Sequence, residues 1–173
     1  MRIILGWPTG RTGVDLDSHF QIPDNSSNAW GLHWARNIGQ CYDAGCDFYR
    51  YSATDNVTLD IDEQQAGGME TITVITAKSG FTYSHSVHDW SNRADNNSTD
   101  LSKSGAKVTV YLGSSLPGSD YPTEYTVPSG RSTGGKGNLW RVFTFTKSGG
   151  LVKVHQLTNL TTSNPNSSYG DVY

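Results

Sequence analysis

The chain has 173 residues, a length that fits one domain with a single substantial core. Hydrophobic residues make up 35% and charged residues 17%, while five Trp, nine Tyr and five Phe are too many aromatic side chains for a disordered coil. The net charge of −3 provides no basic surface for nucleic acid, and no apolar run approaches the roughly 18 residues that a membrane-spanning helix needs. We therefore expect a folded domain that neither binds nucleic acid nor inserts into a membrane.

The start of the chain, M-R-I-I-L-G-W-P, has an apolar core too short for a signal peptide and has no cleavage site, so it is expected to be a first strand. The next segment, 14–20, reads V-D-L-D-S-H-F. Side chains alternate between the two faces of a strand, so Asp15, Asp17 and His19 share one face. The apolar residues of this segment share the other face, which we expect to be buried.

A second acidic strand is predicted at 57–62, with Leu59 and Ile61 inward and Asp60 and Asp62 outward. Two pairs of like charges in one small chain indicate either a bound cation or two separate solvated faces.

The remaining strand-like segments follow at short, regular intervals. They are 29–35, 47–51, 70–77, 81–90, 106–112, 123–127, 139–145 and 151–157. We expect 70–77 to form a hairpin with 81–90, and 139–145 to form another with 151–157. No helical periodicity is present. The pattern predicts an all-β fold, a two-layer antiparallel β-sandwich of about ten short strands over residues 1–160, followed by a linker or docking arm at 161–173.

The only cysteines are Cys41 and Cys46. A disulfide between them would close a small loop and would point to an oxidising, extracellular compartment. Six N-x-S/T sequons are compatible with a glycoprotein, although several are expected by chance in so Asn-rich a chain; they begin at Asn25, Asn56, Asn96, Asn97, Asn159 and Asn166.

Calcium binds six to eight hard oxygen ligands, commonly carboxylates and backbone carbonyls. The sequence predicts a calcium site whose candidate ligands are Asp15, Asp17, Asp60, Asp62 and Glu70. His19 could instead adapt this site to a transition metal, because imidazole suits zinc, nickel or copper. His85 and His88 are expected on opposite faces of their strand, so they cannot both bind one metal without distortion.

Aromatic residues suggest a further possibility. Trp30 and Trp34 are four residues apart in a predicted strand and share a face, which makes them candidates for stacking on sugar rings. A glycan-active enzyme is a remote alternative. Its two carboxylates would flank a scissile bond, whereas the acids here occur as clustered doublets. The G-x-S-x-G motif of nucleophilic hydrolases is absent.

Several segments resemble the YfaP/DUF2135 type of bacterial surface or secreted domain, in the family's order and over roughly residues 2–157. They read R-I-I-L-G-W, D-L-D-S-H-F, L-D-I-D-E, G-M-E-T-I-T-V, Y-S-H-S-V-H-D-W, L-S-K-S-G-A-K-V-T-V-Y and L-W-R-V-F-T-F. Met69 departs from the family's usual proline, and the loop between the cysteines looks like a local elaboration. The resemblance implies an antiparallel β-sandwich used as an accessory module, with both acidic doublets and Glu70 retained.

The sequence thus predicts a non-catalytic, secreted or surface-displayed β-sandwich that is stabilised by calcium and serves adhesion or assembly with other copies or domains of a surface protein. A lectin-like carbohydrate-binding module is the alternative.

Overall fold

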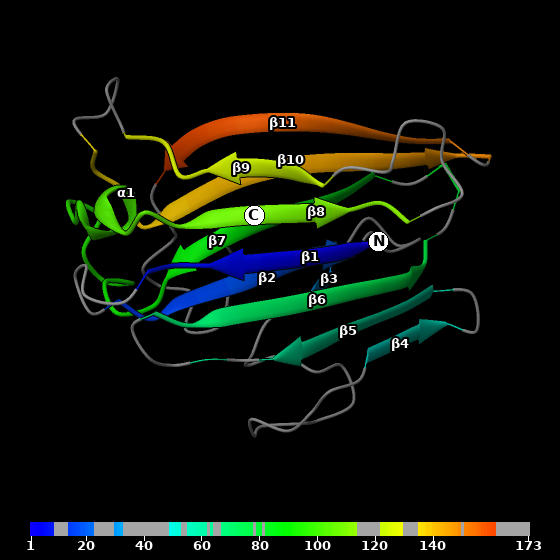
Figure 1. Cartoon of the computed structure of the whole chain (residues 1–173), viewed down its shortest axis with the longest axis horizontal. Helices are drawn as coiled ribbons and strands as arrows, with labels where there is room; N and C mark the ends of the chain where they lie inside the picture. The colour runs from blue at the N-terminus through cyan, green and yellow to red at the C-terminus, as the bar shows by residue number, and fades with distance from the viewer. Residues whose placement is uncertain are drawn as a thin grey trace.

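In a computed structural model the chain forms two antiparallel β-sheets packed face to face (Figure 1). The structure describes residues 1–8, 14–22, 30–32, 49–52, 55–61, 63, 67–77, 79–80, 82–113, 122–129, 135–149 and 151–161. Within these ranges it describes the backbone alone at 21–22, 30–32, 49–52, 55–59, 151–153 and 158–160. The predicted two-layer β-sandwich is confirmed.

Sheet A has six strands in the order β4-β5-β6-β1-β8-β9. They are β1 (Arg2–Gly6), β4 (Tyr49–Ser52), β5 (Asp55–Ile61), β6 (Met69–Thr76), β8 (Lys107–Tyr111) and β9 (Thr123–Thr126). The first strand of the chain lies in the middle of this sheet, between β6 and β8, and is antiparallel to both.

Sheet B has five strands in the order β11-β10-β7-β2-β3. They are β2 (Leu16–Ile22), β3 (Trp30–Leu32), β7 (Thr82–Asp89), β10 (Leu139–Ser148) and β11 (Leu151–Thr161). The predicted hairpin between the last two strands is confirmed, since β10 and β11 pair antiparallel. A one-turn helix, α1 (Asp100–Lys103), precedes β8. Residues 162–173 of the predicted C-terminal arm lie outside the described residues.

The hydrophobic core fills the space between the sheets. Ile3 and Leu5 of β1 and Ile72 of β6 enter it from sheet A. On the sheet B side, Tyr83 stacks on Phe145 with ring centroids 4.7 Å apart. Alternation along each strand sends every second side chain into this core. As a result, the residues between them face outward.

The predicted hairpin of 70–77 with 81–90 is wrong. Strand β6 pairs with β1 and β5 in sheet A, whereas β7 pairs with β2 and β10 in sheet B. The connection between β6 and β7 therefore crosses from one layer to the other. Two amphipathic strands joined by a short turn can pair side by side in one sheet, or they can pack their apolar faces against each other from opposite sheets. Adjacency in sequence therefore did not decide between a hairpin and a connection between sheets.

Strand β5 also differs from its prediction. Its register against β6 shifts between Leu59 and Ile61, which is the signature of a β-bulge. An extra residue at this point breaks the alternation. Asp60 and Ile61 are consequently both exposed, and the prediction that Ile61 points inward is wrong.

Candidate functional site

Strand β2 presents two of the predicted ligands on its outward face. Leu16 and Phe20 belong to the core, so the alternating residues Asp17 and His19 point away from it, as the sequence predicts. Both side chains are nevertheless buried, with only 3% and 2% of their surface exposed. A buried carboxylate beside a buried imidazole is costly unless each has polar partners, so this face of β2 is not an ordinary solvated surface.

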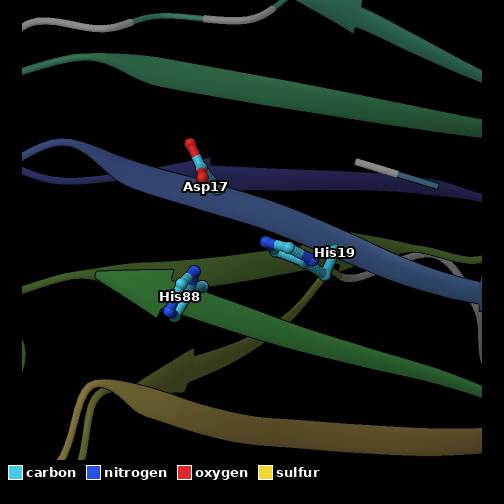
Figure 2. A group of neighbouring side chains, drawn as sticks. All are labelled: Asp17, His19 and His88. Carbon is cyan, nitrogen blue, oxygen red and sulfur yellow. The ribbon is translucent and has the colours of Figure 1, made fainter. Parts of the chain in front are cut away.

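The neighbouring strand contributes a third side chain to the same place. His88 of β7 lies directly opposite Asp17 in the β2–β7 register and is 5% exposed. One oxygen of Asp17 and one ring nitrogen each of His19 and His88 all lie within 4.8 Å of one another. Figure 2 shows the arrangement: two side chains come from β2 and one from the end of β7. We call this group the Asp-His-His cluster.

The two imidazoles do not stack face to face. The rings of His19 and His88 are 5.6 Å apart at an interplanar angle of 82°. Burial, with the nearby guanidinium of Arg93 as a smaller cause, lowers the pKa of His88 from 6.5 to about 4. The ring of His88 is therefore neutral at physiological pH, the form in which imidazole nitrogen binds a metal.

The inward face of the same strand has a second polar group, inside the core. The Ser18 backbone N–H donates to Oε2 of Glu70 at 2.5 Å, which links β2 to β6 of the opposite sheet. The Ser18 hydroxyl lies 2.9 Å from Nε2 of His85 on β7. Burial lowers the pKa of His85 to about 3, so this ring is also neutral. These contacts anchor β2 to β6 of the opposite sheet and to its neighbour β7 within sheet B.

The described residues of the predicted calcium site do not come together. Asp17 lies on the outward face of sheet B, and Glu70 lies in the core. Asp60 is exposed on the outer face of sheet A, where it accepts a hydrogen bond from the Thr73 hydroxyl at 2.5 Å. One carbonyl of the adjacent glycine loop, that of Gly68, already accepts a hydrogen bond from the backbone of Trp7. The structure thus distributes these carboxylates over separate layers of the sandwich.

Asp15 lies just before β2 and belongs to another neighbourhood. Its negative charge is one of the causes that raise the pKa of the buried Asp89 carboxyl to about 6, after burial itself and together with Asp100. Two hydrogen bonds from Asn92 stabilise the charged form and limit that rise. Asp15 therefore lies close enough to the Asp89 carboxyl to affect its charge, as Asp100 does.

Several predicted site residues cannot be placed. Asp62, Trp34, Cys41 and Cys46 lie outside the described residues, and only the backbone of Trp30 is described. The predicted disulfide and sugar-binding platform therefore stay predictions, as does calcium as the bound ion.

The outer face of sheet A has a different character from the Asp-His-His cluster. Among the described residues, the large apolar side chains with the greatest exposure are Ile75 at 64%, Met69 at 46%, Tyr111 at 43% and Ile61 at 40%. All four project from this one face, because they alternate with core residues or lie opposite outward-facing ones. Ile4, half-buried, lies between them on the central strand.

Sequence reasoning included Asp17 and His19 as candidate ligands and missed His88. The alternation of β7 correctly separates His85 from His88, but no local signal says which other strand lies beside His88. A scan of known protein families finds no match to this chain, and no curated protein matches it significantly. The resemblance to the YfaP type thus stays an expectation. In the described part of the chain, no helix is long and apolar enough to cross a membrane.

Proposed function

We propose that this chain is a non-catalytic, secreted or surface-displayed β-sandwich module for adhesion or assembly, and that it makes contact through the outer face of sheet A. The observation that supports the proposal is the exposure of Ile61, Met69, Ile75 and Tyr111, which all project from that face. Exposed apolar side chains that share one face are a common mark of a protein–protein contact surface.

The face also bears polar and charged residues. Ile4 and two threonines lie side by side in the middle of the face, since Ile4 lies opposite Thr71 on one side and Thr109 on the other. An exposed ion pair between Lys107 and Glu124, 2.9 Å apart, borders it on the β8–β9 side. Contacts between subunits commonly combine apolar side chains with charged groups at the rim. The partner that we propose is another copy of this chain or a neighbouring domain of the same surface protein.

The proposal predicts self-association that depends on the apolar side chains. Replacing Ile75 and Met69 together by lysine puts one charge near each end of β6 on the proposed contact face. The double variant should sediment as a monomer at concentrations where the natural protein associates, because desolvating an unpaired charge costs several kcal/mol. Sedimentation velocity over a concentration series makes the measurement.

The matched control is Thr82→Lys, which adds a lysine at an exposed position of β7 in sheet B. This variant should associate like the natural protein. A natural protein that stays monomeric across the whole series, or a double variant that associates as strongly as the control, would contradict the proposed surface. Glycan binding that is lost on Trp30→Ala would instead favour the carbohydrate-binding alternative.

A further inference from the structure

We infer that Asp17, His19 and His88 form a binding site for a divalent transition-metal ion, of which zinc is the best match to the donor set. The site lies on the outward face of sheet B, whereas the proposed assembly surface is the outer face of sheet A. It goes beyond the proposed function and does not depend on it.

The kind of ion follows from the donor atoms. Two imidazole nitrogens and one carboxylate oxygen suit zinc, copper, nickel or iron. Calcium and magnesium prefer a shell of oxygens, and this cluster provides only one oxygen-bearing side chain. Three protein ligands leave one position of a tetrahedral zinc ion for a water molecule or another group.

The three ligand atoms need to move only a short distance toward one another to bind a zinc ion. Zinc–ligand bonds of about 2.0–2.1 Å in a tetrahedron place the ligand atoms about 3.4 Å from one another. The three candidate atoms lie within 4.8 Å of one another, so each pair has at most about 1.4 Å to close. Rotation about the side-chain torsions of His19 and His88 can supply this, and in Figure 2 the ring of His19 extends toward the space between the other two.

Strand pairing fixes the backbone around the cluster. Asp17 and His88 are directly opposite each other in paired strands, and His19 is two residues further along the same face. On the other side of β2, the Ser18 backbone N–H donates a hydrogen bond to Glu70 of the opposite sheet. Ligands on two adjacent, anchored strands are better positioned than ligands on loops. Burial of all three side chains further favours ion binding, because the low local dielectric strengthens the attraction between the ion and the Asp17 carboxylate.

The test is calorimetric titration of zinc chloride into protein that has been treated with EDTA and dialysed. The natural protein should bind one zinc ion per chain, and calcium chloride should give no comparable heat. The near-isosteric variants Asp17→Asn, His19→Gln and His88→Gln should each weaken zinc binding by about a hundredfold or more, since even the loss of a residue that only orients a ligand costs 10–100-fold. The control His155→Gln removes an exposed histidine of β11 and should bind zinc like the natural protein.

The location of the ion is checked without any variant. Natural-protein crystals grown with one equivalent of zinc should show an anomalous peak at the zinc absorption edge between Asp17, His19 and His88. No binding by the natural protein, a peak elsewhere, or unchanged affinity in three folded variants would overturn the inference. If a variant fails to fold, the anomalous peak still decides the question.

Discussion

At the scale of single residues, β2 shows how alternation puts different chemistry on the two sides of one strand. Asp17 and His19 face outward into the Asp-His-His cluster, and Ser18 between them faces inward to Glu70 and His85. A polar group inside a core is tolerated only when it is hydrogen-bonded. The bond from Ser18 to Glu70 satisfies a backbone N–H and joins the two sheets, so we expect Glu70 to be a structural residue.

Replacement of Glu70 tests that role. Glu70→Ala removes the acceptor and leaves a buried cavity, so the free energy of unfolding should fall by about 2–4 kcal/mol. Glu70→Gln keeps a carbonyl oxygen that can accept from Ser18 and should cost only about 1 kcal/mol. Urea denaturation monitored by tryptophan fluorescence measures both values. Equal losses in the two variants would show that the hydrogen bond from Ser18 contributes little.

His85 makes stability depend on pH. Its pKa is about 3 in the folded protein and about 6.5 in the unfolded chain, so below pH 6.5 the unfolded chain binds the extra proton. The stabilisation from a neutral His85 is complete above pH 6.5 and is lost by about 1.4 kcal/mol per pH unit as the pH falls toward 3. His85→Gln should therefore flatten the dependence of the urea midpoint on pH between 6.5 and 4.

Asp89 acts in the opposite direction over a similar window. Its pKa is raised to about 6, so the folded protein holds a proton that the unfolded chain releases above pH 3.8. Its contribution to stability therefore falls as the pH rises from 3.8 to 6. Comparing His85→Gln with the natural protein cancels this contribution, because Asp89 is present in both. An unchanged pH dependence in the variant would contradict the burial of a neutral His85.

At the scale of elements, a glycine lies at each end of the β10–β11 hairpin, and the two positions favour glycine for different reasons. Gly137 precedes β10 with φ of +138°, and a Cβ there would lie 2.7 Å from the Thr161 carbonyl oxygen at the end of β11. Asn138, next in sequence, is fully buried, and its backbone N–H donates to that same carbonyl. Gly149, in the turn, has φ of +60° with open space around it. Only the first glycine is required by a close approach of the backbone.

This difference predicts that replacement by alanine lowers the free energy of unfolding by unequal amounts at the two positions. Gly149→Ala should cost about 1 kcal/mol, the penalty of a left-handed conformation for alanine. Gly137→Ala adds a clash with a backbone oxygen that cannot turn aside, so it should cost about 2 kcal/mol or more. Thermal denaturation of the two variants gives the comparison. A smaller loss for Gly137→Ala than for Gly149→Ala would contradict the close packing of residue 137 on Thr161.

At the scale of the whole molecule, the sandwich separates its chemistry by layer. The outer face of sheet A has the exposed apolar side chains, the core has the Ser18–Glu70–His85 contacts, and the outward face of sheet B has the Asp-His-His cluster. Because a two-layer fold has two outer faces, assembly through one leaves the other available for an ion. The proposed surface and the inferred metal site can therefore be removed separately by substitution.

The sequence by itself determined the fold class, most of the strands and the final hairpin, because alternation and turn chemistry are local properties. It also indicated which face of β2 bears Asp17 and His19. Tertiary structure alone decided that β6 and β7 belong to different sheets and that a bulge turns Ile61 outward. The place of His88 beside Asp17 was likewise beyond the sequence. That neighbourhood depends on the pairing of strands some 70 residues apart, and pairing is set by how two apolar faces fit around one core.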